Sequence, residues 1–275
     1  MRKFALWTFA VAWLAPAALP QDPQRVTVAF SDPARPKKLV VDMSFGSVSV
    51  HGYGGQEVIV ETSNRAGIRA PGRREAEPPP GMHRIGPSTA PGLEITEENN
   101  TVRISSARSP FAQADVTIQV PVQTSVTVNA MRGNSISIDN INGEIEANNL
   151  NGQVTITNVS GSVVAHSMNG KILASLNSVT PEKPMSFSTM NGDIDVTLPA
   201  SIKANVRLKT DRGDMFTDFD IKTDSAAQPP QVEDNRKKGG RYRARFDRTT
   251  IGTINGGGPE IQFTTFNGNI LIRKK

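Results

Sequence analysis

Apolar and polar residues alternate along most of the chain, in short segments that are separated by small turns. Between residues 129 and 173 these turns recur at Arg132-Gly133, Asn142-Gly143, Asn151-Gly152, Ser160-Gly161 and Asn169-Gly170. An apolar or small residue stands two and four positions after most of the glycines. Alternation with a period of two residues, bounded by Asn-Gly, predicts short strands joined by tight turns. The corner glycines, for example Gly170, are expected to have a positive φ.

The turns are of two kinds that alternate along the chain. The first kind usually follows methionine or leucine, and its glycines are residues 133, 152, 170, 192 and 213, which are 18 to 22 residues apart. The second kind follows asparagine with isoleucine or valine, at Gly143 and Gly161. The repeating unit is therefore two strands and two corners. A unit of about 20 residues that cannot bury its own apolar face is typical of a solenoid.

An antiparallel meander is the alternative fold, because Asn-Gly is also a strong hairpin signal. A meander gives no reason for alternate turns to share flanking residues, whereas the equivalent corners of a parallel solenoid stack on each other. We therefore predict an all-β fold, a parallel β-solenoid (similar to a β-helix or β-roll) with coils of about 18–22 residues and two strands per coil. The last coil, with the basic end Arg273-Lys274-Lys275, is expected to cap the stack.

The same pattern predicts which residues meet in the core. Stacked parallel strands would place Ile145 beside Val163, and Val154 beside Ile172. The apolar residues that stand directly before the turns are expected to join this core, and they include Leu150, Val159 and Met168.

The first 20 residues have the pattern of a secretory signal peptide. Two basic residues precede an apolar segment, Phe4–Leu14, which is too short to cross a bilayer, and Ala15-Pro16-Ala17 resembles a cleavage site. We expect an exported protein that is periplasmic, on the cell surface or extracellular, with no transmembrane segment in the mature chain. Cleavage would also remove both tryptophans, Trp7 and Trp13. Residues 21–37 are then a lead-in, and residues 38–275 form one β-solenoid domain.

Two stretches, residues 64–92 and 222–245, interrupt the alternating pattern and are interpreted as inserted loops. Both are rich in basic residues. If they project from one side of the solenoid, they form a patch that could bind an anionic envelope polysaccharide or lipopolysaccharide phosphates. Two solvated loops that bind nothing are the alternative. The candidate binding residues are Arg65, Arg69, Arg73, Arg74 and Arg84 in the first loop, and Arg236, Lys237, Lys238, Arg241, Arg243 and Arg245 in the second.

Composition excludes several kinds of chemistry. The chain has no cysteine, so it has neither a disulfide framework nor a thiol nucleophile. His51, His83 and His166 lack the spacing of metal ligands, and no motif for a nucleophile elbow or a phosphate loop is present. Aromatic residues that could stack on bases are almost absent from the basic loops, which argues against nucleic acid as a partner. We expect no cofactor.

The outward positions directly after the first-kind glycines contain the best candidate for an enzymatic or metal site. In successive coils these positions are Gln153, Lys171, Asp193 and Asp214. Stacking would make Asp193 and Asp214 near neighbours, and two adjacent carboxylates can share a cation such as Ca²⁺ or act in acid–base catalysis. A solvated charged face is the alternative. If the acidic face is functional, the protein is a polysaccharide-active enzyme, which is the alternative to a non-catalytic role. A third possibility is an envelope sensor whose partner is another envelope protein.

Several phrases of the sequence resemble a known family. They are FGSVSVHGYGG at residues 45–55, the serial Asn-Gly corners, INGGGPEIQFTTFNG at residues 254–268 and the terminal NGNILIRKK. Together they resemble the bacterial putative-adhesin family of unknown-function β-solenoid domains, which is similar to the head domain of certain autotransporter adhesins. The resemblance covers roughly residues 39–275 and implies an exported, non-catalytic envelope protein with a structural or adhesive role. It supplies no catalytic or binding residues.

Overall fold

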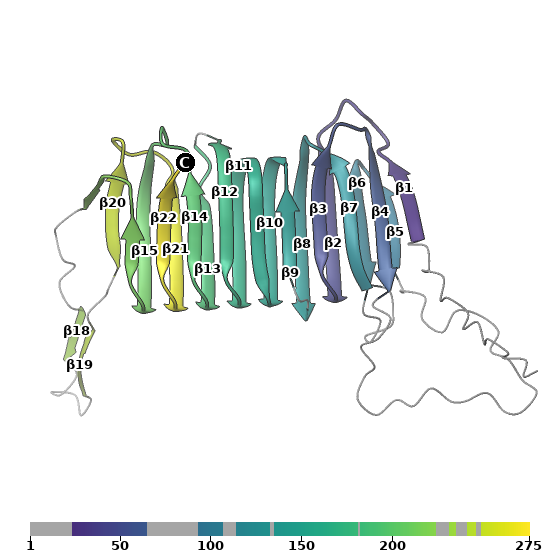
Figure 1. Ribbon diagram of the computed structural model, residues 1–275. Helices are drawn as coiled ribbons and strands as arrows, with labels where there is room; N and C mark the ends of the chain where they lie inside the picture. The colour runs from purple at the N-terminus through teal and green to yellow at the C-terminus, as the bar shows by residue number, and fades with distance from the viewer. Residues whose placement is uncertain are drawn as a thin grey trace, which may run out of the picture.

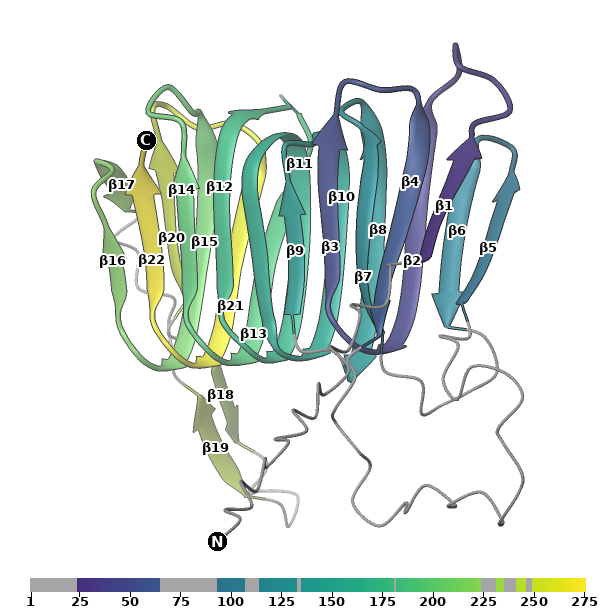
Figure 2. The same cartoon turned by 45° about the vertical axis from the view of Figure 1, so that its right-hand side comes forward.

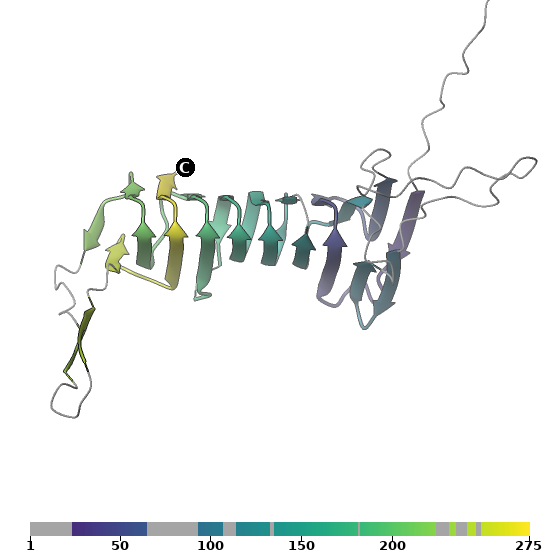
Figure 3. The same ribbon diagram turned by 90° about the horizontal axis from the view of Figure 1, so that it is seen from below.

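The computed structural model describes residues 24–64, 93–106, 114–132, 135–180, 182–223, 231–234, 241–245 and 249–275. These residues form an elongated rod in which strands are stacked side by side along the long axis (Figures 1 and 3). All of the regular structure in these ranges is β, and none of it is a helix that could span a membrane. The rod has two broad faces, and the chain passes from one face to the other at corners along its long edges (Figure 2).

The first face consists of parallel strands, with antiparallel pairs at both ends. From one end of the rod to the other its strands are β5 (Leu93–Glu98), β6 (Thr101–Ser106), β2 (Lys37–Phe45), β8 (Thr124–Arg132), β10 (Asn142–Asn151), the second half of β11 (Gln153–Asn169), β13 (Met185–Asn191), β21 (Glu260–Asn267), β15 (Ala204–Arg212), β20 (Thr250–Ile254) and β17 (Ile221–Thr223).

The second face has the same character, with antiparallel pairs at the N-terminal end only. Its strands are β1 (Gln24–Ala29), β4 (Glu57–Asn64), β7 (Ala114–Pro121), β3 (Val48–Tyr53), β9 (Ser135–Asp139), the first half of β11, β12 (Ile172–Val179), β14 (Ile194–Leu198), β22 (Ile270–Lys274) and β16 (Met215–Thr217). A separate antiparallel pair is formed by β18 (Gln231–Asp234) and β19 (Tyr242–Arg245).

Apolar residues of the two faces meet in one continuous core. The predicted neighbours are found: Ile145 pairs with Val163 between β10 and β11, and Val154 pairs with Ile172 between β11 and β12. All four side chains are buried. The prediction of an all-β, solenoid-like fold is confirmed, with a sheet of mixed rather than purely parallel strands.

The order of strands along the rod differs from the order of the chain. On the first face β21 lies between β13 and β15, and on the second face β22 lies between β14 and β16. The C-terminal coil is therefore an interior coil, and the prediction that Arg273-Lys274-Lys275 caps the stack is wrong. That end is closed instead by β20, which pairs antiparallel with β15, and by β17.

Two of the three apolar residues that precede the turns point outward rather than into the core. Leu150 and Met168 are exposed, whereas Val159 is fully buried. The alternation that places Ala147 inside also places Leu150 outside, so the prediction for Leu150 and Met168 is wrong. Val159 remains inside because the strand register shifts between Ile156 and Val159.

The boundaries of the domain also differ from those expected. The predicted lead-in, residues 21–37, includes β1, which pairs antiparallel with β4 and belongs to the rod. The second insertion was expected to begin at Lys222, but Lys222 and Thr223 lie in β17 and pair with β20. Most of the two predicted insertions lies outside the described residues.

Candidate binding edge

The corners of the first kind stack along one edge of the rod and repeat a four-residue arrangement. At residues 167–170 it consists of an inward Ser167, an outward Met168, Asn169 and Gly170. Related sequences stand at residues 149–152, 189–192 and 265–268. Each of the four positions forms a row that runs along the rod, and each row has a different physical role.

The glycine row allows the coils to approach closely. A Cβ atom on Gly170 would lie 1.9 Å from the carbonyl oxygen of Gly152, and one on Gly268 would lie 2.0 Å from that of Gly192. Gly170 is not one of the glycines with a positive φ, so the reason expected from the sequence is wrong at this corner. Glycine is required there because the neighbouring backbone occupies the space of a side chain.

The inward row consists of hydroxyl side chains that donate to the glycine carbonyls of the adjacent coil. The distances are 3.2 Å from Ser167 Oγ to Gly152 O, and 3.0 Å for Thr189 to Gly170, Thr265 to Gly192 and Thr210 to Gly268. All four donors are buried. These bonds satisfy carbonyl groups that the tight corner removes from water.

Asn149 occupies the same inward position one coil earlier and breaks the pattern. The residue is 1% exposed, and among the described residues neither its amide nitrogen nor its amide oxygen has a hydrogen-bond partner. A buried amide without partners is destabilising, because it has lost its bonds to water and gained none.

The asparagine row is a ladder of side-chain amides. Asn169 donates to Asn151 at 3.0 Å, Asn191 donates to Asn169 at 2.8 Å, and Asn267 donates to Asn191 at 2.8 Å. The ladder includes the C-terminal coil as its fourth member, which explains why that coil fits beside β13. Each interior amide donates one of its two N–H groups and accepts one bond at its oxygen within the row.

Arginines stand at the two ends of the asparagine ladder. Along the rod, Arg132 on β8 lies beside Asn151 at one end of the ladder, and Arg212 on β15 lies beside Asn267 at the other end. The guanidinium carbon of Arg132 lies 5.9 Å from the ring centre of Phe45, and that of Arg212 lies 5.5 Å from the ring centre of Phe266. Both distances are in the range of cation–π contacts.

The outward row is apolar, and we call it the apolar edge. Its members lie on five successive strands of the first face and are between 38% and 62% exposed: Met131, Leu150, Met168, Met190 and Phe266. The register places polar residues at both ends of the run, Ser44 on β2 and Asp211 on β15. Large apolar side chains that are exposed in a contiguous row mark an interaction site more often than isolated ones do.

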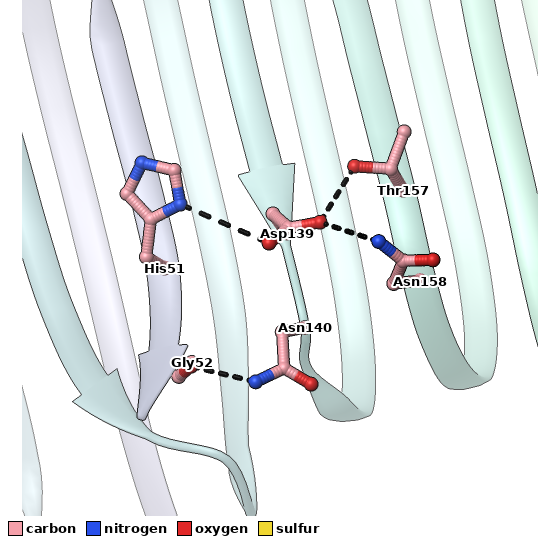
Figure 4. Close-up of polar contacts among 6 residues, drawn as sticks. All are labelled: His51, Gly52, Asp139, Asn140, Thr157 and Asn158. Atoms are coloured by element: carbon pink, nitrogen blue, oxygen red, sulfur yellow. Dashed lines mark hydrogen bonds and ion pairs between the residues drawn. The ribbon is translucent and has the colours of Figure 1, made fainter. Parts of the chain in front are cut away.

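The opposite corners carry a polar row (Figure 4). The carboxylate of Asp139 accepts hydrogen bonds from Thr157 Oγ1 at 2.8 Å and Asn158 Nδ2 at 3.0 Å, and its other oxygen lies 4.0 Å from His51 Nδ1. Asn140 donates to the carbonyl of Gly52 at 2.8 Å. The Thr157 hydroxyl donates to Asp139 and not to His51, so these three residues do not have the hydroxyl–histidine–carboxylate order of a catalytic triad.

The corners of the second kind differ from the first in backbone conformation. Asn140 and Asn158 have positive φ angles of 57° and 54°. These left-handed residues precede Ile141 and Val159, which are buried. The asparagine conformation therefore turns the next apolar side chain inward, whereas the corners of the first kind leave it outside.

The prediction that Asp193 and Asp214 are near neighbours is wrong, because the C-terminal coil lies between them. Asn269 lies between the two: its backbone N–H donates to Asp193 Oδ1 at 2.8 Å, and its Oδ1 accepts from the backbone N–H of Asp214 at 2.9 Å. The carboxylates are thus two strand spacings apart, about 9.6 Å. In the described ranges no cluster of three or more acidic, histidine or cysteine side chains has the arrangement of a metal site.

A third carboxylate on this face, Asp195, forms an ion pair. Arg273 Nε lies 2.8 Å from Asp195 Oδ1, and Arg273 Nη2 lies 3.2 Å from Asp195 Oδ2. The hydrogen bonds and the charge of Asp195 raise the pKa of Arg273. Asp193, Asp195 and Asp214 therefore bind groups of the C-terminal coil and help to hold it in place.

The structure leaves the basic patch untested. Arg65, Arg69, Arg73, Arg74 and Arg84 lie outside the described residues, as do Arg236, Lys237, Lys238 and His83. Arg241 directly precedes β19, and Arg243 and Arg245 belong to it. The patch stays a prediction.

A cavity of about 440 Å³ lies at the end of the core near β16 and β17. Its walls are mainly apolar and include Leu208, Met215, Phe219 and Ile270. Ile270 and Leu208 are buried core residues, so the cavity continues the core column beyond its last complete coil.

Comparison with known proteins places the chain in a family. The family model described as Toastrack DUF4097 matches residues 97–245, which is more than half of the chain. The chain belongs to this Toastrack family. The resemblance drawn from the corner motifs is thereby confirmed. The match ends before β20, so the C-terminal coil of this Toastrack protein lies beyond it.

Solved structures with similar folds have little sequence in common with the chain. A putative cell adhesion protein from Clostridium sporogenes is 12% identical, with a TM-score of 0.45 and coverage of 92% of this chain and 100% of the other. A putative adhesin from Bacteroides fragilis is 13% identical, with a TM-score of 0.37 and coverage of 93% and 98%. No protein with a curated description matches the Toastrack chain.

Proposed function

We propose that this Toastrack protein is an exported, non-catalytic structural and adhesive protein of the cell envelope. Its stacked coils, of about 18–22 residues and two strands each, form a stiff rod. The observation that carries the proposal is the repetition of equivalent coils along the whole rod, about 4.8 Å apart. A periodic surface suits many weak contacts with a repetitive partner, because linked contacts strengthen each other without a deep pocket.

The proposed partner is an anionic polymer of the envelope, bound through the basic insertions. Beyond Thr223, the second insertion contains six basic and three acidic residues up to Arg245, and the basic ones include Arg241, Arg243 and Arg245 at β19. Clustered cations attract phosphate and carboxylate groups over several ångströms, and salt screens this attraction. The N-terminal signal-peptide pattern is consistent with such a location. The names of the similar structures, putative adhesins, agree with this role.

The test is co-sedimentation of the mature chain, from Gln21, with washed cell envelopes at low and high salt. One variant replaces Arg241, Arg243 and Arg245 with glutamine. A matched control replaces three exposed cations of the rod, Arg35, Lys203 and Arg207. We expect envelope binding that is reversed by salt and weakened several-fold by the β19 substitutions only.

Two outcomes would contradict the proposal. Equal loss of binding in both variants would show that net charge rather than the insertion decides retention. Absence of binding at either salt concentration, with a folded protein, would exclude a charge-driven envelope adhesin.

A further inference from the structure

We propose that the apolar edge is a lipid-binding ridge, which inserts its side chains into the acyl layer of a lipid surface. The ridge consists of Met131, Leu150, Met168, Met190 and Phe266, one from each of five successive strands. At about 4.8 Å per strand the row is about 19 Å long. The proposal concerns a surface separate from the basic insertions and does not depend on them.

The shape of the ridge favours a lipid layer over a second copy of the chain. The row is a single residue wide and lies on a corner, so it is convex. Stable protein interfaces bury about 800 Å² on each partner, and two convex ridges that meet along a line cannot reach this area. A fluid acyl layer, by contrast, adapts to a narrow convex edge.

The polar groups beside the ridge are suited to the same surface. The amides of Asn151, Asn169, Asn191 and Asn267 bind each other, so they lose few bonds to water when the edge approaches an apolar layer. Unpaired amides at this position would oppose insertion. The mutual bonds of the ladder therefore lower the cost of bringing this polar row to a lipid interface.

The charges at the ends of the ladder fit lipid headgroups. Arg132 and Arg212 are exposed and stand at opposite ends of the asparagine row. Arginine at the margin of an inserted apolar segment can bind the phosphate of a headgroup while apolar side chains enter below it. Asp211 terminates the apolar edge on β15, so the inserted length is limited to the five residues named above.

The first experiment is flotation of the mature full chain with phosphatidylcholine vesicles in about 0.5 M salt, where the Debye length is only a few ångströms. The variant M168Q/M190Q keeps the side-chain length but makes the ridge polar. The control is V164T, which changes an exposed apolar residue on β11, the strand of Met168, but on the flat face of the sheet. We expect the unmodified chain and V164T to float, and the double variant to bind at least about tenfold more weakly.

The second experiment places a fluorescent probe on the ridge. The mature chain lacks tryptophan, because Trp7 and Trp13 both precede Gln21. Met168→Trp therefore introduces a single tryptophan at the ridge, and Val164→Trp introduces one on the flat face. We expect vesicles to shift the emission of the Met168→Trp protein to the blue and brominated lipid to quench it, with no change for Val164→Trp.

Three results would overturn the inference. The chain could fail to float, or M168Q/M190Q could float as well as the unmodified chain. Sedimentation equilibrium could instead show a dimer that M168Q/M190Q abolishes, which would assign the ridge to self-association. A variant with the basic insertions neutralised should still float at high salt, so a failed ridge and a failed envelope adhesin can be distinguished.

Discussion

Phe187 and Phe263 stack nearly parallel in the centre of the core, with ring centres 5.4 Å apart and an angle of 13° between the rings. Phe187 belongs to β13 and Phe263 to the C-terminal coil, and both are fully buried. This contact joins the last coil of the chain to the middle of the rod.

Replacing Phe263 with alanine should therefore destabilise the protein by about 3–5 kcal/mol, because it leaves a cavity where two coils meet. Phe263→Leu, which retains most of the volume, should cost about 1.5 kcal/mol or less. Chemical denaturation followed by circular dichroism would measure both. Equal effects of the two substitutions would contradict tight packing at this position.

Gly170→Ala should destabilise the rod by about 1–3 kcal/mol or more, since its Cβ would lie 1.9 Å from the Gly152 carbonyl oxygen and would force two coils apart. Gly54→Ala is the control, because its Cβ would meet no atom within 4 Å. Thermal unfolding of the two variants should differ in Tm by several degrees. A tolerated alanine at Gly170 would mean that the coils are not in this close contact.

Asn149→Val should stabilise the protein by about 1–2 kcal/mol, because it removes a buried amide that has no hydrogen-bond partner in the described part of the chain. Thr189→Val, at the equivalent position two coils away, should instead destabilise the protein. It deletes the 3.0 Å bond to the Gly170 carbonyl and should cost about 1 kcal/mol. Urea unfolding of both proteins tests the pair, and destabilisation by Asn149→Val would indicate that the amide has a partner in solution.

The loss of stability that occurs as the pH falls into the acidic range should depend on Glu97. Its carboxylate accepts bonds from the hydroxyl of Ser31 at 2.5 Å and from the backbone of Ser31 and Asn100, and these lower the pKa of Glu97. Because the folded pKa is the lower one, the contribution is present above the unfolded pKa of about 4.3 and is lost as the pH falls through the folded pKa. Glu97→Gln should flatten the fall in Tm below about pH 4.3.

The exposed Glu94 on the same strand provides the comparison for this measurement. Glu94→Gln removes the same charge from this strand and leaves the bonds between Glu97 and Ser31 intact. If both glutamine variants flatten the fall in Tm equally, general charge repulsion rather than the bonds to Ser31 would be the cause.

Much of the local architecture could be predicted from the sequence because each coil repeats the same chemistry. The period-two pattern after Gly143 and Gly161 identified the inward residues and the pairing of Ile145 with Val163. The prediction for Leu150 and Met168 fails because the period of two continues through the corner and turns both side chains outward. Extended through the corner in this way, the pattern also indicates the hydroxyl row and the outward ridge.

The order of the coils could not be predicted by counting along the chain. If the coils stacked in the order of the chain, Asp193 and Asp214 would be neighbours, but the C-terminal coil lies between them. The asparagine ladder contained the missing signal: Asn191 and Asn267 share a corner motif, whereas the corner at residue 212 has arginine. Coils with matching corner residues bind each other best, so the C-terminal coil lies directly beside the coil of Asn191. The coil of Arg212, which comes next in the chain, lies on the far side of the C-terminal coil.

The interior position of the C-terminal coil also determines when the protein can finish folding. Most of the strands from β1 to β14 have their partners within that part of the chain, but one edge of each strand beside β21 and β22 stays unpaired until these two strands are in place. The backbone N–H of Lys275 adds to this pairing, since it donates to the carbonyl oxygen of Leu198 at 2.9 Å. A chain that is prematurely terminated near its end would thus lose the centre of its C-terminal half, with two unpaired sheet edges that face each other and can capture strands from other molecules.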